Sequence, residues 1–218
     1  MTDTQPAAGQ QRRAFWLKHL HQWHWISSAI CLIGMLLFAV TGFTLNHAGQ
    51  IEARPAVQTR HAILPAPVLD KVRAAAPARA ARAGEAKAPM PAVLAEWLAQ
   101  ALAIDASGRE AEWSADEIYV ALPRPGGDAW VSIALDSGEA QFERTTRGAI
   151  SYLNDLHKGR NTGAAWSLFL DAFALACLVF CVTGLFLLKL HAGGRVATWP
   201  LVGLGLVVPV LLAILFIH

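Results

Sequence analysis

The chain has 218 residues, of which 55% are hydrophobic and 16% are charged, and its net charge is +2. A soluble domain usually carries about a quarter charged residues, so this composition excludes an ordinary soluble enzyme. The basic residues form no dense stripe, which argues against a nucleic-acid partner. The apolar residues are concentrated in three blocks, and these predict a membrane protein in contact with the lipid bilayer.

Three blocks are long and apolar enough to span a membrane as helices. Trp25 to Leu45 contains no charge and would reach about 31 Å as a helix. Ala164 to Leu188 is interrupted only by Asp171, and Val196 to Ile217 is uncharged. We therefore predict three transmembrane helices, at residues 25–47, 164–189 and 196–218.

The short polar segments predict how these helices are oriented. The tail at residues 1–24 contains three basic residues and one acidic residue, and the loop at residues 190–195, with the lysine before it, contains no acid. Short positive segments favour the cytoplasmic side, so residues 48–160 are expected outside. A cleaved signal peptide is the alternative for the first block, but this block is longer than the usual apolar core of a signal.

The outer segment divides into an Ala/Pro-rich part at residues 48–91 and a patterned part at residues 92–147. The first part has few large apolar groups and is expected to be irregular, apart from a short helix at residues 68–76. Ala92 to Ala103 has the apolar spacing of a helix. Three segments alternate as antiparallel strands do: Ile118 to Leu122, Trp130 to Leu135 and Gln141 to Thr145. We expect a small α+β module that binds or positions a partner, followed by a lead-in at residues 148–163.

Seven of the eight histidines lie near the ends of the predicted spans. They are His19, His21, His24 and His191 on the cytoplasmic side, and His47, His157 and His218 on the outer side. A neutral imidazole is costly against hydrocarbon but is a good metal ligand. Two histidines from different helices can hold the iron of a haem between them. His24 and His47 would be about 35 Å apart along one helix, so the pattern predicts two sites, one at each face.

The candidate residues follow from this pattern. The candidate haem ligands are His21, His24, His47, His157 and His191. For a metal ion without a porphyrin, such as zinc or free iron, the candidates are His24, His47, His157 and His218. Between His21 and His24 we prefer His24 as the residue that faces the bundle. The alternative is that these histidines lie at the interface and contact lipid headgroups.

Two further features suggest that the spans pack together and enclose functional groups. Asp171 lies in the outer half of the second span. We expect its carboxylate to hydrogen-bond the nitrogen of a histidine that does not bind the metal, or to relay a proton. The alternative is an acidic residue at the start of a helix. The segment from Phe38 to Phe43 resembles the segment from Phe180 to Leu185. Glycine and threonine allow helices to approach closely, and the two spans run in opposite directions, so the match suggests an inverted repeat.

Several segments of the chain also resemble a known family. They are Leu20 to Ser28, Val40 to Gly42, Leu45 to His47, Leu135 to Glu139, Asp155 to Arg160 and Gly163 to Trp166. These segments are similar to the helices and the sheet end of PepSY-associated transmembrane-helix proteins. Together with the three predicted spans, the resemblance implies an integral membrane α-helical protein with three transmembrane helices and a small α+β PepSY-like module. It implies the bacterial inner membrane, and with the orientation predicted from the charges the N-terminus is cytoplasmic and residues 48–160 are in the periplasm.

Larger proteins of this group are inner-membrane reductases that bind two haems and release iron from ferric siderophores. The resemblance therefore implies up to two haem b groups, held by histidines of the first and second spans, and a ferric siderophore as substrate. The sequence contains no flavin or nicotinamide motif, so a separate electron donor is expected. A homodimer could supply the further helices of the larger reductases, or the chain could be an accessory subunit.

Two classes of function remain open from the sequence. The first is a haem-dependent ferric reductase, or its accessory subunit, that passes electrons across the membrane. The alternative is a non-catalytic membrane anchor whose PepSY module regulates a partner such as a peptidase, or a structural subunit of a transport complex.

Overall fold

The computed structural model describes all residues except 1–7, 52–53, 78–85 and 218. The chain divides into two compact units. One consists of Met1–Leu37 and Leu168–His218 and is called the helical unit below; the other consists of Phe38–Ser167 and is called the sheet unit.

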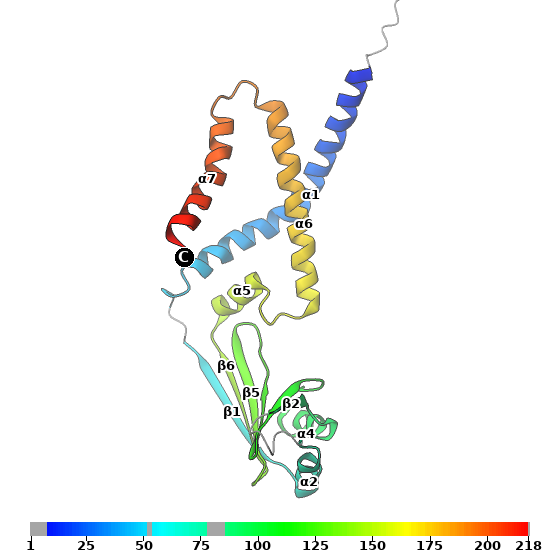
Figure 1. Ribbon diagram of the computed structural model, residues 1–218, viewed down its shortest axis with the longest axis vertical. Helices are drawn as coiled ribbons and strands as arrows, with labels where there is room; N and C mark the ends of the chain where they lie inside the picture. The colour runs from blue at the N-terminus through cyan, green and yellow to red at the C-terminus, as the bar shows by residue number, and fades with distance from the viewer. Residues whose placement is uncertain (1–7, 52–53, 78–85, 218) are drawn as a thin grey trace, which may run out of the picture. The chain divides into compact units, whose positions relative to one another are not determined.

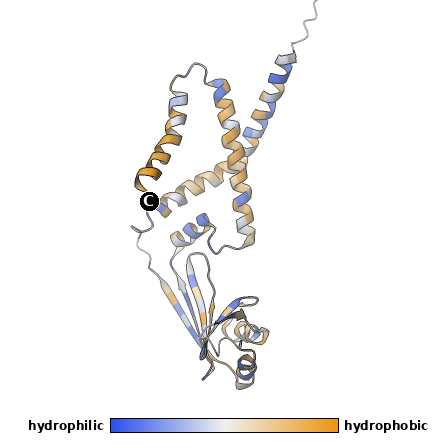
Figure 2. Cartoon of the chain, viewed as in Figure 1, coloured by the Kyte–Doolittle hydropathy of each residue, from blue (hydrophilic) through white to orange (hydrophobic). Residues whose placement is uncertain are grey.

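Three long helices contain the apolar blocks of the sequence. They are α1 (Ala8–Asn46), α6 (Ala164–His191) and α7 (Thr198–Phe216). Each is long and apolar enough to cross a membrane, and Figure 2 shows apolar residues over most of α6 and α7. The three predicted spans are thereby confirmed, and the chain is a membrane protein. α1 begins at Ala8 rather than near residue 25, because the basic tail contains strong helix formers and continues the helix.

Small side chains mark the place where α1 and α6 meet in the helical unit. A Cβ atom added at Gly34 would lie 2.3 Å from Cε2 of Phe173, so only a glycine allows this approach. Ser27 and Cys31 of α1 and Thr183 of α6 are buried. Close packing through small residues is the usual way in which helices associate in lipid, where no hydrophobic effect drives them together.

The sheet unit contains an antiparallel sheet of six strands, shown in Figure 1. Its order is β1-β6-β5-β4-β3-β2. The strands are β1 (Ala56–Ile63), β2 (Ala86–Pro89), β3 (Glu110–Trp113), β4 (Glu117–Ala121), β5 (Gly127–Ala134) and β6 (Glu139–Thr146). Helices α2 (Ala66–Ala74) and α4 (Ala92–Leu102) belong to the same unit and contribute to its core.

The core of the sheet unit follows from the alternation of its strands. Ile118 and Val120 of β4 are fully buried, and so are Val131 and Ile133 of β5, while the residues between them lie on the other face. On α4, Leu94 and Leu98 are buried at helical spacing, and they join the strand residues in one hydrophobic cluster. The predicted helix and the three predicted strands correspond to α4, β4, β5 and β6.

The α+β module begins with β1 at Ala56, not at residue 92 as the sequence pattern predicts. The short helix predicted at residues 68–76 corresponds to α2, whereas β1 and β2 lie in a segment whose Ala/Pro-rich composition suggests an irregular structure. β1 pairs with β6 only, from Ala56 opposite Thr146 to Ile63 opposite Glu139. As an edge strand it is mostly exposed and carries polar residues, so its apolar alternation is too weak to recognise.

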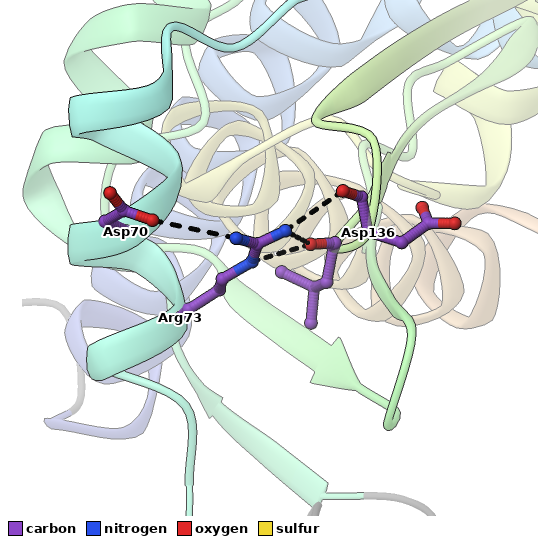
Figure 3. Close-up of polar contacts among 4 residues, drawn as sticks. Asp70, Arg73 and Asp136 are labelled. Atoms are coloured by element: carbon purple, nitrogen blue, oxygen red, sulfur yellow. Dashed lines mark hydrogen bonds and ion pairs between the residues drawn. The ribbon is translucent and has the colours of Figure 1, made fainter.

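Arg73 of α2 fastens that helix to the turn between β5 and β6, as Figure 3 shows. Its guanidinium donates through Nε to the carbonyl oxygen of Leu135 at 2.7 Å, and through Nη2 to that of Asp136 at 3.0 Å. Asp70, one turn earlier on α2, lies 3.6 Å from Nη1 and holds the guanidinium from the other side. α2 is therefore tied to the sheet by polar contacts as well as by the burial of Leu69 and Val72.

A further helix, α5 (Ala149–Lys158), occupies the expected lead-in at residues 148–163. It ends at Gly159, whose φ of 67° is the left-handed conformation that glycine adopts at helix C-termini. This helix is not among the elements predicted from the sequence, although Ile150, Leu153 and Leu156 have helical spacing.

Candidate functional site

His24 of α1 is held against α6 by three residues of one α6 segment. Its Nδ1 lies 3.1 Å from Oγ1 of Thr183. The ring stacks on Phe180, with the centroids 4.7 Å apart and the planes at 15°. A Cβ atom added at Gly184 would lie 3.3 Å from Cε1 of His24, so the glycine lets the ring come close to the helix. His24 is half-buried and, as preferred from the sequence, faces a neighbouring helix.

The hydroxyl group of Thr183 also has acceptors within its own helix, the carbonyl oxygens of Val179 at 2.6 Å and Phe180 at 3.1 Å. A hydroxyl has one hydrogen, so when that hydrogen is donated to one of these carbonyl groups the oxygen can accept from Nδ1 of His24. In that arrangement Nδ1 carries the proton and Nε2 keeps its lone pair.

His157 of α5 meets a matching arrangement within the sheet unit. Its Nδ1 lies 2.7 Å from Oγ1 of Thr41. Its ring lies against Phe38, with the centroids 4.9 Å apart, and a Cβ atom added at Gly42 would lie 3.4 Å from its Cε1. Thr41 Oγ1 also lies 3.3 Å from the carbonyl oxygen of Phe38, and when its hydrogen is donated there the oxygen can accept from Nδ1 of His157.

The two histidines are thus held by the two segments that match in the sequence. Each segment reads Phe-x-Val-Thr-Gly, at residues 38–42 and 180–184. Its phenylalanine, threonine and glycine lie three and four residues apart, on one face of a helix. The sequence analysis attributes the match to close helix packing, whereas the structure places a histidine on each copy.

His21 and His191 are brought together in the helical unit, from α1 and α6. Their ring centroids are 5.7 Å apart, and the ring planes are nearly perpendicular. Each Nδ1 lies 2.8 Å from the carbonyl oxygen four residues earlier, that of Leu17 or Leu187. A carbonyl oxygen can only accept, so Nδ1 carries the proton in both rings, and both Nε2 atoms have free lone pairs.

The remaining histidines make fewer contacts. His47 donates from Nδ1 to the carbonyl oxygen of Phe43 at 2.9 Å. The ring of His19 lies 4.2 Å from that of Phe15. His61 of β1 lies 3.5 Å from a carboxylate oxygen of Glu139 and is exposed. The candidate His218 lies outside the described residues.

Comparison with known proteins identifies the family. A family model described as putative PepSY_TM-like matches residues 15–218. The chain belongs to this PepSY_TM-like family. No curated protein and no solved structure matches the chain. The resemblance inferred from the sequence is thereby confirmed for the family and for its combination of membrane helices with a small antiparallel sheet domain.

The metal-ligand candidates of this PepSY_TM-like protein occur singly or in pairs. Within the residues that the structure describes, no three side chains of His, Cys, Asp or Glu gather as a metal cluster. Of the candidate ligands, His21 and His191 are in mutual ring contact, whereas His24 and His157 each contact a threonine. A haem needs no more than two protein ligands, because the porphyrin supplies the other nitrogens.

Asp171 of the PepSY_TM-like protein lies exposed on α6. Among the described residues it makes no hydrogen bond or ion pair, so the structure does not bring it to a histidine. Its expected role behind a histidine remains a prediction.

Two further residues of α5, which are not among the candidates chosen from the sequence, make contacts beside His157. Asp155 of α5 accepts from the backbone N–H of Gly126 at 2.8 Å, and Gly126 lies in the turn between β4 and β5. Asn154, which is buried, accepts from the hydroxyl of Thr44 on α1 at 2.9 Å. α5 therefore contacts the β4–β5 turn and α1 while it presents His157. The adjacent asparagine and aspartate of the lead-in are the feature of the sequence that could have indicated these contacts.

An apolar cleft of about 440 Å³ lies between the amino-terminal part of α1 and the end of α6. Its volume is within the usual range of small-molecule sites. The apolar lining includes Trp16 and Phe186, and the basic residues Arg13 and Lys189 also border it. The cleft thus combines an apolar body with two cations, close in sequence to His21 and His191.

Proposed function

We propose that this chain is a haem-binding protein of the bacterial inner membrane that passes electrons across the membrane for the reductive release of iron from ferric siderophores. The proposal is carried by one observation on the five candidate haem ligands. In His21, His24, His47, His157 and His191, Nδ1 lies within 3.1 Å of a carbonyl or hydroxyl oxygen that can accept its hydrogen. Nε2 therefore retains the lone pair with which histidine binds metals.

The residues present fit a haem better than they would fit lipid headgroups. A headgroup phosphate accepts hydrogen bonds, so it would favour histidines with a proton on Nε2, whereas these rings carry it on Nδ1. Metal-binding histidines usually donate from their second nitrogen to an oxygen, which fixes the ring for ligation. The five histidines have this pattern. A bound haem b would supply a one-electron redox couple in the membrane.

The residues of the chain would hold and orient up to two such groups. At the same end of α1 and α6 as His21 and His191, the cleft lined by Trp16 and Phe186 offers an apolar surface, and Arg13 and Lys189 offer cations for acidic substituents. On the proposed orientation this end of the helices is cytoplasmic, and His47 and His157 lie on the periplasmic side. A separate reduced carrier would supply each electron, which converts the ferric iron of the siderophore into ferrous iron.

The alternative is a membrane anchor whose sheet unit regulates a partner such as a peptidase, or a structural subunit of a transport complex. One observation favours it. Tyr119 and Trp130 stack on the face of the sheet away from the core, with their centroids 6.1 Å apart, and Tyr119 is exposed. Aromatic residues on an open face are typical of surfaces that bind other proteins.

The decisive experiment is the absorption spectrum of the full-length protein, purified after expression with haem supplied. We expect a Soret band and, after reduction with dithionite, sharp α and β bands. His24→Ala and His157→Ala should each remove one haem equivalent per chain, whereas His61→Ala, on the sheet edge, should remove none. A colourless wild-type protein would reject the proposal and favour the membrane anchor.

Catalysis is tested with haem-loaded protein in liposomes. A reductant enclosed inside should reduce a ferric siderophore outside, with a ferrous chelator as the readout. Haem-loaded protein that passes no electrons to the external siderophore would limit the function to haem binding.

A further inference from the structure

We propose that the two Phe-x-Val-Thr-Gly segments are equivalent receptors for one imidazole each, which set the tautomer of His24 and His157 and make these two histidines the principal metal ligands. Thr183 and Thr41 are the positioning residues of the two receptors. The inference rests on the proposed function for the identity of the ligand, whereas the choice of tautomer is a property of the chain itself.

The first support is that both receptors use the same three residue types at the same spacing, with the rings stacked at 15° in one receptor and tilted by 41° in the other. The phenylalanine ring lies against the imidazole, at 4.7 Å for Phe180 and 4.9 Å for Phe38. The threonine oxygen accepts from Nδ1, and the glycine removes the Cβ atom that would meet Cε1. A chance packing contact has no reason to repeat these three features together.

The second support is the chemistry of the threonine. An isolated imidazole can carry its proton on either nitrogen. At both receptors a carbonyl oxygen of the same helix lies within reach of the threonine hydroxyl, so its hydrogen has an acceptor there and its oxygen can accept from the imidazole. On the proposed arrangement the receptor selects the Nδ1–H form and leaves Nε2 unprotonated, which is the form that binds iron.

The third support is the contrast with the other candidate histidines. His21, His47 and His191 donate to carbonyl oxygens of their own helices, at residues four positions earlier. Any helical histidine with a suitable side-chain rotamer can make that contact. His24 and His157 are instead held by residues 159 and 116 positions away in the chain, so the fold itself must form before these rings are oriented.

The experiment is nitrogen NMR of the full-length protein in lipid nanodiscs, with ¹⁵N-labelled histidine and without haem. Signals are assigned with single His→Ala variants. In the wild-type protein, His24 and His157 should show a protonated Nδ1 and an unprotonated Nε2. Thr183→Val should lower the ratio of the Nδ1–H to the Nε2–H form of His24 about fivefold, which corresponds to the loss of one net hydrogen bond. Thr41→Val should do the same to His157.

Matched variants separate this effect from a loss of folding. Thr183→Ser and Thr41→Ser keep the accepting oxygen and should keep the wild-type tautomers. The signals of His21, His47 and His191 should not change in any of these variants, because their acceptors are backbone carbonyls. Unchanged tautomers in both valine variants, with the protein folded, would overturn the inference.

The haem content of the same variants distinguishes this inference from the proposed function. If wild-type protein binds no haem but the tautomers follow the threonines, the proposed function fails and the receptors stand. If haem binds but the valine variants leave both tautomers unchanged, the receptors fail and the proposed function stands. In the haem-loaded protein, each valine variant should alter the low-spin ferric EPR signal of one haem only.

Discussion

The two units of the protein use their apolar residues in opposite ways. In the sheet unit, a cluster that includes Leu98, Trp113 and Ile133 is buried within the chain. In the helical unit most of the large apolar side chains are exposed, and among its described residues α7 buries none. Contact with lipid explains the exposed apolar residues of the helical unit. The few polar residues within this unit are therefore the most informative about its packing and its function.

The largest test of this comparison is the truncation of Trp113, which is 1% exposed in the sheet unit. Trp113→Ala should destabilise the sheet by about 3–5 kcal/mol, because it leaves a cavity in a closed core. Hydrogen exchange should show lost protection in the strands while the long helices stay protected. Trp113→Phe is the matched control: the indole Nε1 has no hydrogen-bond partner among the residues that the structure describes, so its removal costs little. Equal damage by both variants would contradict this account.

The second test concerns the crossing of α1 and α6. Gly34→Ala places a Cβ atom against Phe173 and should cost about 1–3 kcal/mol, because the helices must move apart. Gly203→Ala, on α7, meets nothing within 4 Å and should be neutral or slightly stabilising. Thermal unfolding in detergent compares the two variants. If Gly34→Ala behaves like Gly203→Ala, the crossing is not closely packed.

The third test concerns the polar tie between α2 and the sheet. Arg73→Met removes the bonds to Leu135 and Asp136 and should cost about 1 kcal/mol, since the side chain is partly exposed and its charge is screened. Lys71→Met, on the same helix, should have no measurable effect. Urea unfolding followed by circular dichroism measures both. A neutral Arg73→Met would show that burial of Leu69 and Val72 is sufficient to hold α2.

The smallest effect is expected at the exposed pair of Lys87 and Glu112, whose charged atoms are 2.8 Å apart. The hydrogen bond and the charge of Glu112 raise the pKa of Lys87 above its usual 10.5. The pair therefore stabilises the sheet below this pH and loses its effect as the pH rises through the raised pKa. Heteronuclear NMR should show Lys87 titrating at a higher pH in the wild-type protein than in a Glu112→Gln variant. Lys87→Met should change the unfolding midpoint hardly at all, because exposed pairs contribute little.

The sequence predicts those parts of the fold that have a strong local pattern. The three membrane helices, α4 and strands β4 to β6 follow from their apolar spacing. β1 and α5 escape prediction for a physical reason: β1 is stabilised by pairing with β6, and α5 by contacts with Thr44 and Gly126, all distant in the chain. The histidines themselves were recognisable from their place near the ends of the spans.

The receptors could be predicted only in part. The match between residues 38–42 and 180–184 is visible in the sequence, but its partners are not. Thr41 and His157 are 116 positions apart, and nothing local to either residue specifies the other. Their contact depends on the tertiary arrangement of α5 beside α1. The tautomer follows from a further detail, the use of the threonine hydrogen within its own helix.

The short helix α5 makes three hydrogen bonds from neighbouring residues. Asp155 accepts from the β4–β5 turn, Asn154 accepts from Thr44, and His157, two residues after Asp155, is hydrogen-bonded to Thr41. This helix thus connects the β4–β5 turn to an imidazole beside a membrane helix. A molecule that binds at that hairpin would lie one hydrogen bond away from the helix that presents His157.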